Sequence, residues 1–416
     1  MLVRGGRVID PAQQLDRRLD VRVRGDVIAE LGEHLEPERG EDTIDASEAY
    51  VAPGFIDMHV HLREPGHSQK ETIASGTAAA AAGGFTAVAC MPNTEPPLDD
   101  AERIAWVRMR ASGASARVYP VAAITRGCSG EEAVDFESLQ GAGAVAFSDD
   151  GSTVMNEALL QSAAEHARTV PGCFISHCED EELKGDGVMH LGEVSLSLGL
   201  PGSPEAAEAT IVERDLRIAE RTRKSWHIAH LSTIGGLKAL RAARRRGIEP
   251  TCEVTPHHLV FTDETVRERG GAAKVNPPLR PPEHVRALRD AVRDGTIDAF
   301  ASDHAPHTDE EKNAGMHASC VGFSGLEIAV GAYAYALPDL PLMRYVALLS
   351  TNPARILNVP GGSLRPGAPA DLTIFADRQW IVKAKDFASK GRSTPFEGMK
   401  LPRRAIATIV GGRRIA

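Results

Sequence analysis

From residue 55 onward, short apolar runs alternate with longer stretches whose apolar positions recur at helical spacing. Eight apolar runs are typical of buried strands: Phe55 to Leu62, Phe85 to Met91, Arg117 to Ile124, Ala144 to Phe147, Cys173 to His177, Ser225 to Leu231, Glu249 to Thr255 and Ile297 to Ser302. The stretches between them predict helices at Glu71 to Ala82, Asp100 to Ala111, Asn156 to Val170, Pro204 to Arg221, Ile234 to Arg246 and Pro282 to Arg293. Eight strand-helix units joined by right-handed crossovers close into a barrel. We therefore predict an α/β fold with a TIM-like (β/α)8 barrel over residues 53–359.

The two ends of the chain have a different pattern. Near the start, the strand-like pieces 21–23 and 27–29 flank Gly25-Asp26, which favours a hairpin. Near the other end, residues 372–375 and 406–410 are also strand-like. Neither end could bury much surface alone. We predict that residues 1–52 and 360–416 pair into one small composite β-sandwich domain beside the barrel.

Composition narrows the classes of function. The formal net charge of -10 argues against a nucleic-acid surface, and the basic run 244–246 suits the end of a helix. No stretch has 18 uninterrupted apolar residues, and the first residues lack the apolar segment of a signal peptide. The six cysteines form no CxxC pair, so neither a zinc knuckle nor a disulfide framework is indicated. We expect a cytoplasmic protein with no membrane and no nucleic-acid partner.

Imidazoles and carboxylates gather where the predicted strands end. The catalytic residues of such barrels come from the carboxyl ends of the strands. Strand one carries His59 and His61, which share one face because they are two residues apart. Taken alone, this pair could also be two core histidines. The other strand ends add Asp149 and Asp150, His177, His227 and His230, and Asp303.

This set of side chains suits zinc or a similar divalent ion. Four histidines and two aspartates exceed what one open site uses, so we expect one or two ions per subunit, with two favoured and a hydroxide bridging them. We choose His230 over His227 because it is nearer the mouth of the barrel, and we expect His227 to pack outward under a helix. Alternation along the strand leaves Asp149 and Asp150 at even odds.

Two long segments resemble the signature segments of the dihydroorotases, a family of the amidohydrolase superfamily: Asp57-Met58-His59-Val60-His61-Leu62-Arg63-Glu64-Pro65 and residues 301–312, which begin Ala301-Ser302-Asp303-His304. Residues 91–94, 256–259 and 276–280 are similar to that family as well. The resemblance implies that His59, His61 and Asp303 bind one zinc and that His177 and His230 bind the second. No lysine occurs between Lys70 and Lys184 to supply the carbamylated bridge of many relatives. As in class I dihydroorotases, Asp150 is implied to be the shared ligand.

The resemblance also implies a substrate and a mechanism. The reaction would be the zinc-dependent, reversible cyclisation of N-carbamoyl-L-aspartate to dihydroorotate in pyrimidine biosynthesis. Metal-bound hydroxide would attack the cyclic amide, and Asp303 would act as general acid and base. Arg63 suits the substrate carboxylate because guanidinium and carboxylate form two parallel hydrogen bonds. The resemblance adds five further contacts to the substrate: Asn93 and His307 at the carboxylate, Asn276 at the ring, and the backbone of Val321 and Gly322 at the imide edge.

Two rival functions are weighed against this one. A hydantoinase or allantoinase would be expected to bring the missing lysine, and its substrate would give Arg63 no carboxylate to bind. A non-catalytic dihydroorotase-like partner of aspartate transcarbamoylase has usually lost metal ligands, whereas all of them are present here. We expect a homodimer, the commonest assembly, while the sequence leaves a complex with aspartate transcarbamoylase open. The polar segment 307–315 is expected to act as a lid.

Overall fold

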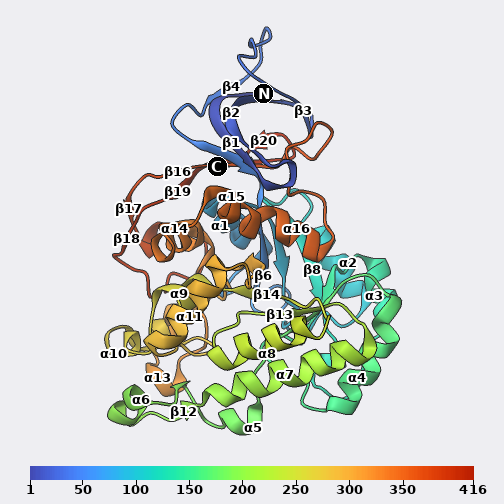
Figure 1. Ribbon diagram of the computed structural model, residues 1–416, viewed down its shortest axis with the longest axis vertical. Helices are drawn as coiled ribbons and strands as arrows, with labels where there is room; N and C mark the ends of the chain where they lie inside the picture. The colour runs from blue at the N-terminus through green and yellow to red at the C-terminus, as the bar shows by residue number, and fades with distance from the viewer.

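The computed structural model describes residues 1–416 and contains a closed barrel of parallel strands (Figure 1). The eight strands lie side by side in chain order: β6 (Phe55–Val60), β7 (Phe85–Cys90), β8 (Arg117–Ala122), β9 (Ala146–Phe147), β10 (Phe174–Ser176), β13 (Trp226–Ile228), β14 (Thr251–Val254) and β15 (Ala299–Phe300). A parallel bridge between Val60 and His304, with the His61 N–H donating to the His304 carbonyl at 2.8 Å, joins the first strand to the segment after the last. The predicted (β/α)8 fold class is confirmed.

Helices cover the outside of the barrel: α1 (Ile73–Gly83), α2 (Ala101–Arg110), α3 (Phe136–Ala142), α4 (Glu157–His166), α7 (Glu205–Thr222), α8 (Ile234–Arg245), α11 (Pro282–Arg293) and α14 (Leu326–Ala336). A cluster of 63 buried apolar residues forms where these helices pack against the outward faces of the strands. Side chains of Thr72, Asp100 and Thr233 cap their helices by accepting backbone N–H groups. Helix α14 was not predicted, because nine of its 11 residues are buried and it has no polar face to reveal the helical period.

Short elements fill the longer connections. Between β10 and α7 lie α5 (Glu181–Lys184), β11 (Met189–His190), α6 (Glu193–Leu198) and β12 (Gly202–Ser203). Between β14 and α11 lie α9 (Pro256–Val260), α10 (Thr265–Arg269) and the 3-10 turn η4 (Gly270–Ala273). After β15 come α12 (Asp309–Lys312) and α13 (Gly315–Ala318), and after α14 come α15 (Leu342–Val346), η5 (Ala347–Thr351) and α16 (Asn352–Leu357). The 3-10 turns η1 (Pro11–Gln13), η2 (Arg126–Cys128) and η3 (Ala167–Thr169) complete the loops.

Strands from both ends of the chain form a second sheet, at the top of Figure 1. Its members are β1 (Leu2–Asp10), β2 (Leu15–Arg24), β3 (Val27–Gly32), β4 (Thr43–Asp45), β5 (Tyr50–Pro53), β16 (Leu372–Ala376), β19 (Arg404–Val410) and β20 (Arg413–Arg414). Strands β2 and β3 form the predicted hairpin, and β16 joins the two ends by pairing with β5. A separate cluster of 16 buried apolar residues forms the core of this sheet.

Residues between β16 and β19 leave the terminal sheet. They contain β17 (Trp380–Ile381), the turn η6 (Ala384–Asp386) and β18 (Lys400–Leu401). Phe387 and Phe396 from this segment share a buried cluster with Phe323 and Ile328 of the barrel. The domain boundaries at residues 52/53 and 359/360 stay a prediction.

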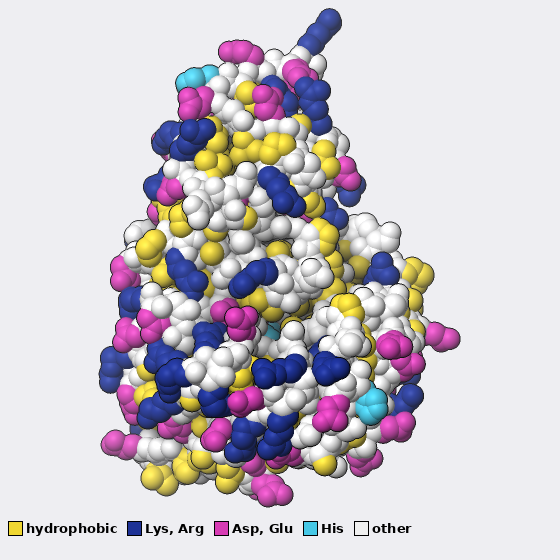
Figure 2. All heavy atoms as spheres, turned by 45° about the vertical axis from the view of Figure 1, so that its right-hand side comes forward, with side chains coloured by type: hydrophobic (Ala, Val, Ile, Leu, Met, Phe, Trp, Pro, Cys, Tyr) yellow, Lys and Arg dark blue, Asp and Glu magenta, His cyan; other side chains and the backbone are white.

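Two features of the surface bear on partners. Every helix of the chain is too short or too polar to cross a lipid bilayer. On the face drawn in Figure 2, Lys and Arg side chains are interspersed with Asp and Glu side chains. A continuous basic surface, which nucleic-acid binding favours, is not formed on that face.

Candidate metal centre and active site

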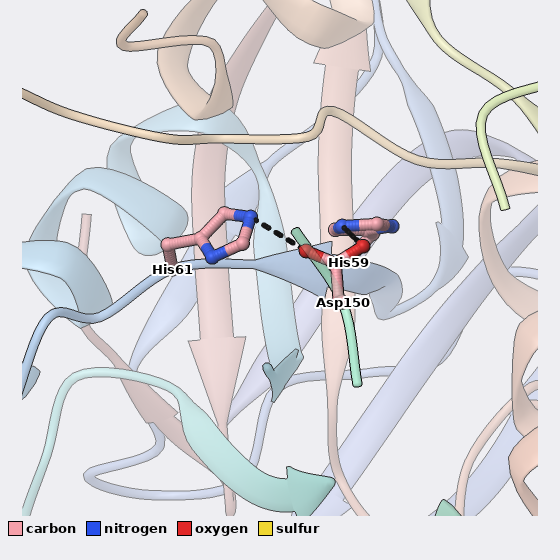
Figure 3. Close-up of side chains that lie close together, drawn as sticks. All are labelled: His59, His61 and Asp150. Carbon is pink, nitrogen blue, oxygen red and sulfur yellow. Dashed lines mark ion pairs between the residues drawn. The ribbon is translucent and has the colours of Figure 1, made fainter. Parts of the chain in front are cut away.

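Two groups of potential metal ligands share the carboxylate of Asp150. His59 and His61 form one group with it, and His177 and His230 form the other; within each group the ligand atoms lie within 4.8 Å of one another. The Asp150 Oδ1 atom is 3.2 Å from Nε2 of His59, and Oδ2 is 3.5 Å from Nε2 of His61 (Figure 3). On the other side, Oδ1 is 3.7 Å from both Nδ1 of His177 and Nε2 of His230. One carboxylate therefore faces four imidazoles.

Asp303 lies beside the first of these groups. Its Oδ1 atom is 3.4 Å from Nε2 of His61 and 3.7 Å from Nε2 of His59. Asp303 is buried and belongs to the segment that follows β15. The structure thus brings together all six predicted ligands.

The opposite nitrogen of three imidazoles is held by a polar side chain. Nδ1 of His59 is 2.9 Å from Oε1 of Glu253, and Nδ1 of His61 is 2.8 Å from Oδ1 of Asn93. Nε2 of His177 is 3.5 Å from Oε2 of Glu179. Such partners fix the tautomer and the ring orientation of metal-binding histidines. Each of these rings therefore turns its other nitrogen toward Asp150.

Burial alone would raise the pKa of each carboxylate in this cluster, but the neighbouring imidazoles reverse the shift. The positive charges of His59 and His61, which lie close to it, hold the pKa of Asp150 well below its usual range. Hydrogen bonds from His227 and His59 lower the pKa of Glu253 to about 2 in spite of its burial. The site therefore concentrates negative charge in the interior, which suits cations.

Several buried ligand atoms have no hydrogen-bond partner. They are Nε2 of His59, Oδ1 of Asp150 and Nδ1 of His230. Buried polar atoms are rarely left unsatisfied, and a bound ion can satisfy those that lack a partner within the protein. Imidazole and carboxylate together are the donor set of zinc and similar divalent metals. The residues present thus fit a metal centre.

Left-handed backbone conformations occur where three strands end at this site. The φ angles of Arg63, His230 and Asp303 are 61°, 31° and 49°, and residues other than glycine rarely adopt such positive values. Such conformations cost free energy, and they cluster at functional sites. They turn the chain so that these side chains face the mouth of the barrel.

The predicted outward orientation of His227 is wrong. His227 faces the barrel interior, with Nε2 3.2 Å from Oε2 of Glu253, while Trp226 and Ile228 pack outward with the helices. The alternation of side chains holds only within a strand, and β13 ends at Ile228. His227 and His230 can therefore both point inward although they are three residues apart.

The choice between Asp149 and Asp150, which alternation leaves open, is decided by hydrogen bonds. Asp149 accepts the backbone N–H groups of Ile124 at 2.7 Å and Thr125 at 3.0 Å, and it also binds the Thr125 hydroxyl. Asp149 thus holds the loop after β8. Only Asp150 faces the histidines.

A cavity opens above the metal ligands, and its lining is mostly polar. The ligand His59 lies below it, fully buried. All six predicted substrate-binding residues line the cavity, together with the other five ligands: Arg63, Asn93, Asn276, His307, Val321 and Gly322, with His61, Asp150, His177, His230 and Asp303. Nε2 of His307 lies 3.1 Å from Nη2 of Arg63 and 2.8 Å from the Val321 carbonyl oxygen. The nitrogen atoms of Arg63 and His307 therefore meet at one wall of the cavity.

Three buried side chains near the site were not predicted. Glu253 and Glu179 orient ligand histidines, and Nδ2 of Asn276 donates to Glu179 at 3.3 Å. His257 is buried with both ring nitrogens unpartnered, and burial lowers its pKa to about 3. The sequence did carry a signal for Glu253: it is a carboxylate between the apolar residues Cys252 and Val254 of strand seven.

Comparisons with known proteins agree with this geometry. A family model described as dihydro-orotase-like matches residues 49–235. The chain is 47% identical over 417 residues to the dihydroorotase of Pelotomaculum thermopropionicum, covering 99% of this chain and 97% of that protein. It is 44% identical over 419 residues to the dihydroorotase of Syntrophus aciditrophicus, covering 99% of this chain and 98% of that protein.

Solved structures share the fold. The L-hydantoinase from Arthrobacter aurescens superposes with a TM-score of 0.87 at 22% identity, covering 100% of this chain and 95% of that one. The D-hydantoinase from Thermus sp. superposes with a TM-score of 0.84 at 26% identity, covering 99% of this chain and 94% of that one. The identity to the dihydroorotases is far higher and extends over nearly the full length. The chain belongs to the dihydroorotase family.

Proposed function

We propose that the chain catalyses the reversible cyclisation of N-carbamoyl-L-aspartate to dihydroorotate, a step of pyrimidine biosynthesis, and that it requires zinc. The observation that carries this proposal is one cavity in which the shared-carboxylate histidine groups lie next to the guanidinium of Arg63. A metal centre suits the hydrolysis or formation of a cyclic amide, and the guanidinium suits the carboxylate of this substrate. The curated relatives named dihydroorotase support the same activity.

The residues divide into two zinc sites in this proposal. His59, His61 and Asp303 would hold one ion, His177 and His230 the other, and Asp150 would contact both. When bound, the ions polarise the scissile carbonyl and make water a nucleophile at neutral pH. Glu253, Asn93 and Glu179 keep the histidine rings in the orientation that metal binding needs.

Substrate recognition is assigned to the cavity wall. Arg63 binds the carboxylate through two hydrogen bonds, with His307 and Asn93 beside it. Asn276 contacts the ring, and the backbone of residues 321 and 322 contacts the imide edge. Arg63 is held in place by donating from Nε to the Pro306 carbonyl at 3.2 Å, so little side-chain entropy is lost when substrate binds.

Asp303 is assigned the role of general acid and base. In ring opening its carboxylate accepts the proton of the attacking water and delivers it to the departing amide nitrogen. In ring closure the same carboxylate removes a proton from the ureido nitrogen and returns it to the leaving oxygen. Its position above the first histidine group places it at the cavity surface, where both reacting groups can reach it.

Replacing Asp303 by Asn tests this assignment. Asn keeps the size of the side chain and one oxygen ligand, but it cannot take up the proton. We expect D303N to fold and to retain most of its bound zinc, while kcat for dihydroorotate ring opening falls about 10²- to 10⁴-fold. Thermal unfolding and metal analysis control for misfolding and for metal loss. A kcat within a few-fold of the native value would remove Asp303 from this role.

The assembly and location belong to the same proposal. We propose a homodimer in the cytoplasm, and the mass of the purified protein by light scattering checks the dimer. The non-catalytic alternative predicts no turnover of dihydroorotate by the native chain. The hydantoinase alternative predicts that a hydantoin is hydrolysed faster than dihydroorotate. Assaying both substrates with one preparation separates the three functions.

A further inference from the structure

A third group of metal-ligating side chains lies beside the cavity, apart from the two that share Asp150. It consists of His307, Glu311 and Cys320, whose ligand atoms all lie within 4.8 Å of one another. The three residues come from different parts of the connection between β15 and α14: the loop before α12, α12 itself and the segment after α13. An ion bound here would join these three parts of the connection to one another.

The His307 ring is oriented for such a role. Its Nε2 atom is 2.8 Å from the Val321 carbonyl oxygen, to which it donates, so the lone pair is on Nδ1. That atom faces Glu311, at 3.4 Å from Oε2. Burial and the nearby charges of Arg63 and Lys70 lower the pKa of His307 to about 3, so the ring is neutral and its Nδ1 can bind a cation.

A cation already occupies this position. Nζ of Lys70 is 2.8 Å from Oε1 of Glu311 and 3.3 Å from Nδ1 of His307. The ammonium group is therefore held by two of the three candidate ligands. A competing divalent ion would need to displace this ammonium group, whose side chain is 13% exposed.

Cys320 decides which metal ions this group of three residues prefers. Cysteine binds metal as the thiolate. Thiolate, imidazole and carboxylate together select zinc or another thiophilic divalent ion over magnesium or calcium.

We propose that His307, Glu311 and Cys320 form an additional zinc site, separate from the catalytic centre, that fills when zinc is in excess. Binding releases the Lys70 ammonium from Glu311 and sends the Cys320 proton to solvent. The ion ties α12 and the segment around Cys320 to His307, which lines the wall of the cavity. Excess zinc therefore restrains this wall and inhibits the enzyme.

Two substitutions with opposite expected effects test the site. Cys320→Ser removes the softest ligand, and we expect zinc affinity at this site to fall about 10- to 100-fold or more. Lys70→Met removes the competing ammonium, so zinc should bind more tightly than to the native chain. Neither residue lines the cavity, so both variants should keep the basal activity.

The primary measurement is direct binding. Native protein whose catalytic centre is already loaded is titrated with zinc, and one further ion per chain is expected. Repeating the titration with cobalt should produce a thiolate-to-cobalt absorption band that C320S lacks. The proposal is overturned if the native chain binds no further zinc, or if C320S and native protein bind it equally.

Activity gives a second measurement, which rests on the proposed function. Excess zinc should slow dihydroorotate ring opening by native protein, slow K70M at lower zinc concentrations, and leave C320S unaffected. Equal inhibition of all three proteins would contradict the proposed inhibitory site. Loss of turnover without excess zinc would instead count against the proposed function, so the two failures are distinguishable.

Discussion

Glu253 offers the sharpest test of how this chain positions its metal ligands. Its carboxylate is buried and lies 2.9 Å from Nδ1 of His59 and 3.2 Å from Nε2 of His227. Glu253→Gln keeps the shape but removes the charge. His227 can adapt by donating from Nδ1 to the Thr251 hydroxyl, 2.8 Å away, so that its Nε2 accepts from the new amide. We therefore expect E253Q to remain folded.

The expected loss in E253Q is in metal affinity. Substituting a carboxylate that backs a ligand histidine typically weakens metal binding about 10- to 100-fold, or about 1.4 to 2.7 kcal/mol. Glu253→Ala should behave differently, because it leaves the ring N–H groups of His59 and His227 without an acceptor. At about 1 to 3 kcal/mol for each group, E253A should lose about 2 to 6 kcal/mol of folding stability as well.

Competition with a chromophoric chelator measures the zinc affinity, and chemical denaturation of the metal-free proteins measures stability. Asp10→Asn is a suitable control, because Asp10 is also a fully buried carboxylate but belongs to the terminal sheet. D10N should bind zinc like the native chain. If E253Q binds zinc within two-fold of native protein, the carboxylate does not position His59 and the reasoning is refuted.

Two further predictions concern the substrate pocket and the dependence of stability on pH. Arg63→Lys should lower kcat/KM for dihydroorotate about 10- to 100-fold, because one charged hydrogen bond is lost. Turnover of 5,6-dihydrouracil, which is the same ring without the carboxylate, should hardly change. Equal losses on both substrates would contradict the assignment of Arg63 to the carboxylate. Burial lowers the pKa of Lys224 to about 8, so the unfolded chain binds more protons than the folded one between this pKa and the ordinary value of 10.5. The free energy of unfolding of native protein should therefore rise relative to that of K224M between about pH 8 and 10. Urea unfolding at each pH measures both values. A difference between the two proteins that stays constant or shrinks would refute this prediction.

Sequence patterns predicted the parts of the fold that repeat. The helix at Pro282–Arg293 matches the prediction at both ends, because its apolar positions are regularly spaced and proline stands at its start. Helix α14 was missed because burial on all sides removes the periodic signal. The barrel strands were found, although all eight are shorter than predicted, because the apolar runs extend beyond the residues that pair in the sheet.

The candidate site, like the fold, could be predicted only in part. Strand ends identified the group of ligands, since the barrel brings all carboxyl ends to one mouth. Strand alternation could not predict the inward direction of His227 or the choice of Asp150, which only the family resemblance implied, because the chain turns away from strand geometry where the ligands lie. The contacts of Glu253 with His59 and of Glu179 with Asn276 join segments far apart in sequence. Only the folded structure reveals such partners.

One measurement tests the central claim most directly: the initial rate of dihydroorotate ring opening as metal-free protein is titrated with zinc. A centre in which Asp150 is shared between two histidine pairs predicts a rate that rises from zero and reaches its maximum at two zinc ions per chain. Asp150→Ala removes the shared ligand and should stay inactive throughout the titration. A native chain that stays inactive at every zinc concentration, or that is fully active without metal, would contradict the account.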